Sequence, residues 1–357
     1  MHARIAGALI ATTALALPAA AQAATKTVQA GPFGAQAKQF QDAAGDANEY
    51  FRRVITIHKG DKVRWKINGF HSVTFAPPGG PAPSLIVPDP STPVAGVNDA
   101  GGNPFWFNGQ PTLRPNPTAL GKQGGRTFDP GALMNSGLPL GEGPPPPYVL
   151  RFKRTGTFRY LCVVHPGMKG KVRVVGRGHS VPSAAKDRQE AKRQQKVTLE
   201  RVQRLTTGLG TEDLDKTIQA GNDRRSGATV FKFFPNAPSY KVGETVTLQM
   251  SPGSSEAHTF TFGPTNGRDL YNDQLATVLL GEVFDPRGGY PSDPPPAGVP
   301  TLTPASHGNG FYNSGVLDQD PASPQPASTK VIFGAPGPYS LICLIHPFMT
   351  GTVTVTP

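Results

Sequence analysis

The sequence predicts an all-β protein of two tandem β-sandwich domains, joined by a basic helical linker and carrying long Gly/Pro-rich inserts. Three observations lead to this fold class. The chain has 357 residues, which is more than a single hydrophobic core usually holds. Its 42 Gly and 39 Pro are nearly double the usual share of about 12 %, as is typical of turn-rich β proteins. A long segment also occurs twice, which indicates a duplicated domain.

Residues 1–23 predict a cleaved secretory signal. Arg4 supplies a basic head, residues 5–17 form an apolar run, and Ala21 and Ala23 flank an A-x-A cleavage site. The run is too short to span a bilayer, and no later stretch is long and apolar enough to do so. We therefore expect an exported protein, periplasmic or extracellular, without an integral membrane segment.

The repeat is clearest around the only two cysteines. Residues 152–175 (FKRTGTFRYLCVVHPGMKGKVRVV) match residues 333–356 (FGAPGPYSLICLIHPFMTGTVTVT) along their whole length. Both contain the phrase C-x-x-H-P-x-M, and both continue into an alternation of valine with polar residues that predicts a half-buried strand.

The repeat extends upstream to residues 54–75 and 240–262. Each copy has a Gly-acid pair that opens an alternating strand, then a turn, a histidine and a second alternating strand. The histidines are His71 and His258, and the turn before His258 is four residues longer, which a surface loop tolerates. We therefore predict one domain over residues 24–178 and a second over residues 216–357.

Residues 179–215 between the copies predict a charged helical linker. Its helix is expected over 184–207, with Ser183 as N-cap and Gly208 at its end. A narrow apolar stripe, expected to lie against one of the domains, consists of Leu199, Val202 and Leu205 or Leu209. A solvated linker is favoured over a basic docking surface.

Two Gly/Pro-rich inserts, at about 76–147 and 264–328, separate the strand after the first histidine from the cysteine motif. Both hold a similar phrase, MNSGL at 134–138 and YNSGV at 312–316. Loops of this length are unusual and often functional, and the shared phrase indicates common descent and local order.

Each repeat offers an upstream histidine and then Cys, His and Met in a single loop. A thiolate and two imidazoles in a trigonal arrangement, with a weak axial thioether, form the ligand set of an electron-transferring blue copper site. Two residues separate Cys from His, and two separate His from Met. This spacing allows one tight loop to turn its three donors towards a common point. The fourth donor comes from a distant strand, so the site forms only in the folded domain.

Two other uses of the cysteines remain open at this point. A disulfide between Cys162 and Cys343 is the ordinary expectation in an exported chain, but equivalent positions of separate repeats would have to meet within about 7 Å. Zinc also binds Cys and His, although structural zinc prefers four nitrogen or sulfur donors without a thioether. We favour copper over both.

The pattern resembles the cupredoxins, the plastocyanin/azurin family, and the C-x-x-H-x-x-M loop is most similar to that of amicyanin. The resemblance implies an antiparallel Greek-key sandwich and one type 1 copper in each domain. It also implies that the loop histidine reaches the surface as the electron port. The copper ligands that it implies are His71, Cys162, His165 and Met168 in the first domain and His258, Cys343, His346 and Met349 in the second.

One departure from the family follows the first histidine of each copy. Cupredoxins commonly carry Asn there, bonded across to the Cys loop, whereas this chain has Ser72 and Thr259. A hydroxyl can make a related bond across to the Cys loop, and the sequence leaves the tuning of the reduction potential open.

Related copper enzymes add metal through His-x-His pairs or a His beside the Cys, and this chain has neither. His58, His179 and His307 are expected to be ordinary surface residues, and His2 falls in the signal. We therefore predict an electron carrier rather than an enzyme. The alternatives are an extracytoplasmic copper store or delivery protein, and a chain in which only one repeat is functional.

The net charge of +11 favours acidic partners or an anionic surface. Redox partner proteins are expected, but nucleic acid is not, because an exported chain without a binding motif has no use for it. The sequence leaves the oligomeric state open, and a monomer is typical of small cupredoxins.

Overall fold

The computed structural model describes residues 23–141, 143–165, 167–207, 214–223, 227–264, 283–295, 298–320 and 323–357. Nearly all of the predicted secretory signal, residues 1–22, lies outside them, as do Gly208 and Leu209 at the predicted helix end. Those expectations stay predictions, and so do the exact domain boundaries.

The first half of the described chain forms two sheets that enclose one core. Their strand orders are β10-β5-β1-β3 and β4-β12-β11-β6-β9. The strands are β1 (Thr25–Ala30), β3 (Tyr50–Phe51), β4 (Val54–His58), β5 (Lys62–Ile67), β6 (Thr74–Phe75), β9 (Met134–Asn135), β10 (Tyr148–Arg151), β11 (Gly156–Leu161) and β12 (Lys169–Val175). Alternate residues of both sheets are buried, among them Trp65 and Tyr160, whose rings meet edge to face at 5.4 Å.

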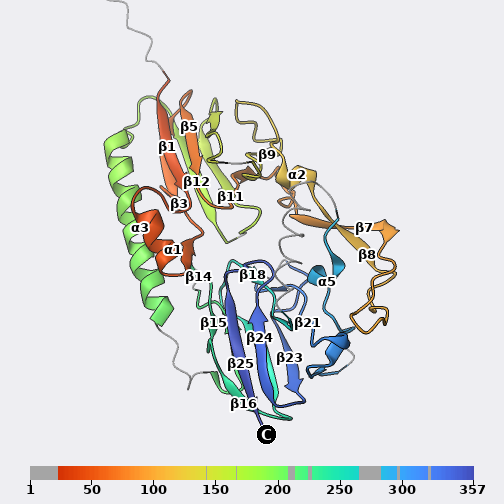
Figure 1. Cartoon of the computed structure of the whole chain (residues 1–357). Helices are drawn as coiled ribbons and strands as arrows, with labels where there is room; N and C mark the ends of the chain where they lie inside the picture. The colour runs from red at the N-terminus through yellow and green to blue at the C-terminus, as the bar shows by residue number, and fades with distance from the viewer. Residues whose placement is uncertain are drawn as a thin grey trace, which may run out of the picture.

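The second half repeats this arrangement with strand orders β15-β13-β17-β23-β20 and β16-β25-β24-β19-β21 (Figure 1). The strands are β13 (Thr217–Ala220), β15 (Phe233–Phe234), β16 (Ser239–Lys241), β17 (Thr245–Met250), β19 (Thr261–Phe262), β20 (Thr301–Leu302), β21 (Tyr312–Asn313), β23 (Ser328–Phe333), β24 (Gly337–Ile342) and β25 (Thr350–Thr356). A separate core that includes Phe260, Phe262 and Phe333 lies between these sheets. The all-β sandwich prediction is confirmed.

The sheets are mixed, so the expectation of purely antiparallel sandwiches is wrong. β1 pairs with β5 and β12 with β4 in parallel, and the second half has the same parallel pairs in β13 with β17 and β16 with β25. A parallel pair needs a crossover connection, which residues 31–61 supply between β1 and β5. The strand periodicity of the sequence does not distinguish the two directions.

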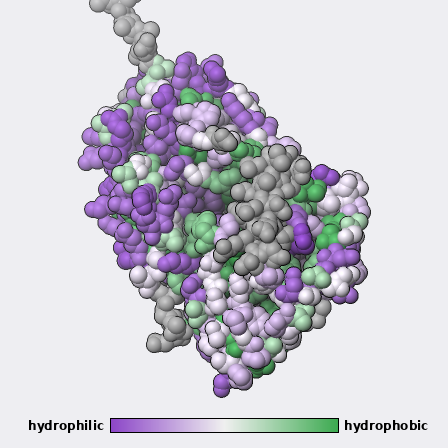
Figure 2. Space-filling view, viewed as in Figure 1, coloured by the Kyte–Doolittle hydropathy of each residue, from purple (hydrophilic) through white to green (hydrophobic). Residues whose placement is uncertain are grey.

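Helix α3 (Ala184–Thr207) has the predicted bounds. The Ser183 hydroxyl oxygen accepts a hydrogen bond from the Lys186 N–H at 3.2 Å, as expected of an N-cap. The predicted stripe of Leu199, Val202 and Leu205 is buried. The outer face of α3 carries the hydrophilic side chains that dominate this side of the molecule (Figure 2).

Helix α3 contacts both halves of the molecule (Figure 1), whereas the sequence predicted contact with only one of them. Its apolar stripe packs with Phe40 and Phe51 of the first half and with Ala228 and Val230 of the second. Phe40 belongs to helix α1 (Gln36–Asp42), and the buried Asp187 of α3 pairs with Lys26 and Arg52. The linker is therefore part of the interface between the halves.

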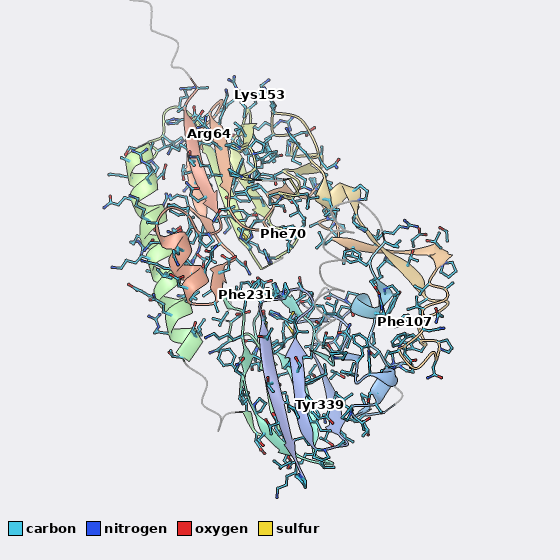
Figure 3. The ribbon with its side chains drawn as sticks, viewed as in Figure 1. Arg64, Phe70, Phe107, Lys153, Phe231 and Tyr339 are labelled. Carbon is cyan, nitrogen blue, oxygen red and sulfur yellow. The ribbon has the colours of Figure 1, made fainter. Side chains whose placement is uncertain are left out.

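Two further contacts join the halves. Strand β2 (Gly45–Ala47) pairs antiparallel with β14 (Ala228–Val230). The inserts, which contribute β7 (Ile86–Pro93), β8 (Pro111–Pro115), α2 (Pro117–Leu120), α5 (Pro286–Gly289) and the 3-10 turn η2 (Ser306–Gly308), pack together through Phe105, Phe107 and the partly buried Tyr290. Figure 3 shows Phe107 beside the second half. No helix among the described residues is long and apolar enough to cross a membrane.

Candidate metal centres

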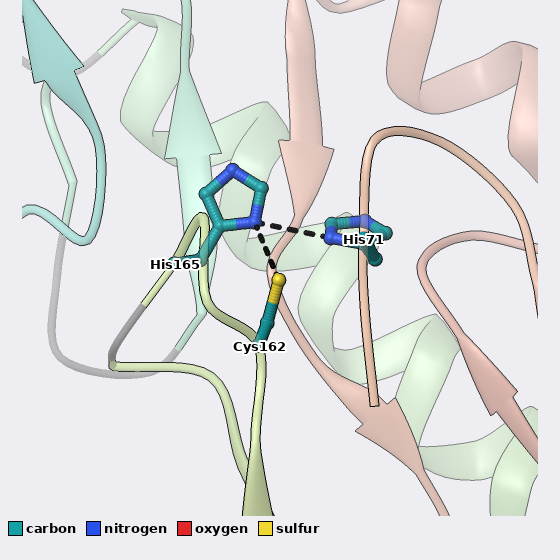
Figure 4. Close-up of side chains that lie close together, drawn as sticks. All are labelled: His71, Cys162 and His165. Atoms are coloured by element: carbon teal, nitrogen blue, oxygen red, sulfur yellow. Dashed lines mark hydrogen bonds between the residues drawn. The ribbon is translucent and has the colours of Figure 1, made fainter. Parts of the chain in front are cut away.

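The first candidate centre brings together His71, Cys162 and His165 (Figure 4). His71 precedes β6, Cys162 directly follows β11, and His165 lies in the loop towards β12. The Nδ1 atoms of the two histidines are 3.1 Å apart, and the Cys162 Sγ lies 3.6 Å from Nδ1 of His165. All three side chains are buried. The sequence predicted these three residues to converge, and they do.

The second candidate centre repeats this triangle with His258, Cys343 and His346. His258 ends the short strand β18 (Ala257–His258), which pairs with β22 (Leu317–Asp318). The two Nδ1 atoms are again 3.1 Å apart, and Sγ lies 3.6 and 3.7 Å from Nδ1 of His258 and His346. The distance between the two histidines and the distance from the cysteine to the loop histidine therefore agree within about 0.1 Å between the two halves.

The donor set of each triangle fits one metal ion. Imidazole nitrogen and thiolate sulfur bind first-row metals at about 2.0–2.3 Å, so donors of one ion lie between about three and four ångströms from each other. The observed separations of 3.1–3.7 Å fall in this range. Both cysteines are free, so the disulfide alternative does not describe this structure.

Backbone hydrogen bonds close each cysteine loop in the same way. The Cys162 N–H donates to the Met168 carbonyl at 3.1 Å, and the Met168 N–H donates to the His165 carbonyl at 2.8 Å. In the second loop the corresponding distances are 3.0 and 2.8 Å. Met168 and Met349 are each 1 % exposed and belong to the same cores as the cysteines. Their place as a fourth ligand stays a prediction.

The electrostatics of both triangles favour the thiolate that a metal requires. Burial disfavours the charged form of Cys162, but the imidazoles of His165 and His71 outweigh it and hold the pKa of the thiol well below its usual value. The pKa of Cys343 is likewise well below its usual value, because His258 and His346 outweigh burial. A low thiol pKa lowers the cost of losing the proton on metal binding.

Ser72 and Thr259 make the bond that the sequence predicted for them. The Ser72 N–H donates to the Cys162 sulfur at 3.3 Å, and its hydroxyl oxygen accepts from the Val163 N–H at 3.0 Å. Thr259 makes the same two bonds in the second half, at 3.4 and 2.7 Å. Each residue therefore fixes the backbone beside the cysteine and donates one hydrogen bond to its sulfur.

The Asn-Ser-Gly residues shared by the two inserts, called the NSG phrase, support the hydroxyl that follows the first histidine. The sequence did not predict this contact. The Ser72 hydroxyl lies 3.1 Å from that of Thr74, which donates to the Asn135 side-chain oxygen at 2.9 Å. Asn135 in turn donates to carbonyls of the insert. Asn313 of the second half bonds to Thr261 at 3.0 Å. The order expected at the phrase is confirmed by β9 and β21, and each phrase anchors its centre to its insert.

His165 does not reach the surface, so the expectation of an exposed electron port is wrong for the first centre, whereas His346 keeps a small exposed fraction. His165 is 6 % exposed, and its Nε2 atom lies 3.3 Å from Oε1 of Glu256, a residue of the other half. Nε2 of His346, whose side chain is 14 % exposed, lies 3.5 Å from Oε2 of the same carboxylate. The two halves meet where the loop histidines were expected to face solvent. Phe70 and Phe231 lie near this contact (Figure 3).

Two sequence features mark this interface. The longer turn before His258, which a surface loop would tolerate as an insertion, carries Glu256. Residues 26–31 (KTVQAG) and 216–221 (KTIQAG) also repeat, which extends the duplication to β1 and β13. Gly31 ends the first phrase with φ +77°, and an added Cβ there would lie 2.8 Å from the His71 ring. The close approach to His71 therefore requires glycine.

Among the described residues, the remaining histidines join neither triangle. His58 lies 3.7 Å from an Asp61 oxygen, and His307 lies between Asp99 and Asp293 at 3.6 and 3.5 Å. The only groups of three or more His, Cys, Asp or Glu found close enough to share an ion, within the described ranges, are the two triangles.

Solved structures of plastocyanin, amicyanin and a purple cupredoxin resemble part of this chain. Plastocyanin from Dryopteris crassirhizoma is 19 % identical over 39 % of this chain and 99 % of its own, with a TM-score of 0.21. A mutant of amicyanin in its reduced Cu(I) form is 16 % identical over 39 % of this chain and 80 % of its own, at 0.21. The purple cupredoxin from Nitrosopumilus maritimus is 20 % identical over 39 % and 98 %, also at 0.21. No protein-family model and no curated protein matches the chain.

Proposed function

We propose that this protein is an exported blue copper protein that carries electrons through two type 1 centres, one in each half. The observation that carries the proposal is the pair of largely buried triangles of two histidines and one cysteine, in which five donor separations measure 3.1–3.7 Å. A thiolate with two imidazoles is the equatorial ligand set of blue copper sites. Met168 and Met349 are the proposed axial ligands.

Copper bound in these triangles would supply the Cu(II)/Cu(I) couple. The protein's own part is to hold the donors in one geometry. Ser72 and Thr259 clamp the backbone after each cysteine, and the loop hydrogen bonds fix the distance from Cys to Met along the chain. Ligands held in this way move little between oxidation states, and a small change of geometry makes electron transfer fast.

The hydrogen bond from the backbone N–H of Ser72 or Thr259 to each sulfur also tunes the potential. A donor on the thiolate withdraws negative charge from the metal, which favours the reduced ion. Burial of the triangles acts in the same direction, because it removes the water that would stabilise the higher charge.

The test is copper loading of the purified full-length chain. We expect two copper ions per chain, an intense blue colour and an electron-spin signal with narrow copper splitting. A colourless protein that binds two zinc ions in the triangles would overturn the proposal in favour of structural zinc.

A copper store or delivery protein is the second candidate. The burial of His165 and the low exposure of His346 favour it, because little imidazole surface is open to a redox partner. Protein-film voltammetry separates the two functions. A carrier gives reversible one-electron waves, and a store gives slow or irreversible ones.

A further inference from the structure

We propose that Glu256 is a bridge through which the two centres exchange electrons, as one carboxylate shared by the outer nitrogens of His165 and His346. The proposal rests on the proposed copper function. It adds that the two centres act as a coupled pair, and it names the residue that couples them.

The geometry gives each carboxylate oxygen one imidazole. Oε1 lies 3.3 Å from Nε2 of His165, and Oε2 lies 3.5 Å from Nε2 of His346. Each of these histidines directs Nδ1 into its own triangle, so Nε2 carries the proton and donates it to the carboxylate. The path from one triangle to the other therefore runs through two imidazole rings, two ion-pair contacts and one carboxyl group.

Asn48 of the first half holds Glu256 in this position. The Asn48 side-chain N–H of the first half donates to Oε1 at 2.6 Å and to the Ser255 hydroxyl at 3.0 Å. The backbone N–H of Asn48 donates to the Gly227 carbonyl at 2.8 Å, next to the β2–β14 pair. The strand pairing that joins the halves thus also places the bridge.

The burial of Glu256 shows that the site is built around a charge. The residue is 4 % exposed, and a buried carboxylate is tolerated only where hydrogen-bond donors surround it. Here the donors are the two imidazoles and Asn48. Within the described residues, the Nε2 atoms of His71 and His258 have no hydrogen-bond partner, so the carboxylate is specific to the loop histidines.

Glu256 has no equivalent at the matching position of the first half, although the centres are duplicated. Glu256 stands two residues before His258, and the residue two before His71 is Gly69. A Cβ at Gly69 would lie 3.3 Å from the His71 ring, so the first half has little room for a counterpart. The four extra residues of the second turn are what bring one acid to the shared position.

The exchange is a one-electron step that needs no other reactant. With copper held in both triangles, one electron would pass from the Cu(I) of one centre to the Cu(II) of the other, so that one ion would be oxidised as the other is reduced. No covalent bond forms or breaks, and both Nε2 protons stay on their rings. Because the carboxylate faces both imidazoles, its negative charge also stabilises the oxidised form of both centres.

The experiment compares Glu256→Ala and Glu256→Gln with wild type in the copper-loaded full-length chain. The control is Glu200→Gln, which removes a carboxylate from the exposed face of α3, 3.8 Å from Lys196. One centre is reduced by a radiolytic pulse, and the intramolecular relaxation rate and both reduction potentials are measured. We expect both Glu256 variants to keep two blue coppers, to slow the exchange about tenfold or more and to raise both potentials. The control should change neither quantity.

Other outcomes separate this proposal from the copper function. Unchanged rate and potentials in blue, two-copper Glu256→Gln would overturn the bridge and leave the copper function standing. A shift of only one potential would show that the carboxylate serves one centre, and it too would overturn the bridge. A wild-type protein without blue copper would remove the function itself. Should Glu256→Ala fail to fold, the isosteric Gln variant decides.

Discussion

The two candidate centres are nearly identical within their triangles and differ just outside them. The histidine nitrogens are 3.1 Å apart in both, and the hydroxyl residue after each first histidine makes the same pair of bonds. Two residues after the loop histidine, however, the first half has Gly167 and the second has Phe348. The donors are the same in the two halves, and what surrounds them has changed.

The changed residues lie in different environments. An added Cβ on Gly167 would lie 3.1 Å from the Cβ of Ser255, in the turn that carries Glu256. Phe348 is 65 % exposed and packs edge-on against Phe231, whose ring lies 4.6 Å from that of His346. The first loop faces the other half closely, whereas the second loop presents an aromatic ring to solvent beside its histidine.

The largest effect is expected from removal of each cysteine. Cys162→Ala and Cys343→Ala should each lose one copper and about half of the blue absorbance, because each thiolate belongs to one triangle only. Copper analysis and absorbance titration measure this. Loss of all colour from either change would show that neither centre forms without the other.

The next effect concerns the asparagines of the shared NSG phrase. Asn135→Ala and Asn313→Ala each remove a buried side chain with bonds to a threonine and to several carbonyls. Each should lower the free energy of unfolding of its half by about 2–3 kcal/mol. Urea unfolding of the metal-free chain measures the loss. A loss in one half alone would show that the two inserts do not support their centres equally.

Removal of the hydroxyls should have a smaller effect. Ser72→Ala and Thr259→Val leave the buried N–H of Val163 or Leu344 without its acceptor, at a cost of about 1–2 kcal/mol each. Thr259→Ser keeps the hydroxyl and is the matched control. Because the backbone N–H to sulfur bond remains in all three, the blue colour should persist. Its loss would indicate that the hydroxyl itself is needed for metal binding.

The smallest effect is expected at the two residues that differ between the loops. Phe348→Ala removes an exposed ring and should change the free energy of unfolding by less than about 0.5 kcal/mol. Gly167→Ala should cost about 1 kcal/mol, because the new methyl group crowds Ser255. Equal costs, measured by urea unfolding, would contradict the difference in environment described above.

Much of the fold and the triangles could be predicted because their signals are local or repeated. The helix over residues 184–207 follows from its cap and composition, and the donors follow from a phrase that occurs twice. The interface could not be predicted in this way. Glu256 is a single acid in a polar turn, and its role depends on the other half lying against it. Periodicity along one strand does not encode which edges of two domains meet.

The low exposure of the loop histidines is a second instance of the same limit. The phrase around His165 and His346 predicts the donor residues and does not indicate what lies against the loop. The pairing of β2 with β14, the packing of α3 against both halves and the contact between the inserts place those loops face to face. The parallel strand pairs were missed for a related reason, because direction depends on long-range order rather than on alternation.

The most direct test of the account is a crystal structure of the copper-loaded chain with anomalous diffraction at the copper edge. The account predicts two copper peaks per chain, one inside each triangle, with the Glu256 carboxylate between His165 and His346. A single peak, a peak outside the triangles, or two separated halves without the Glu256 contacts would contradict it.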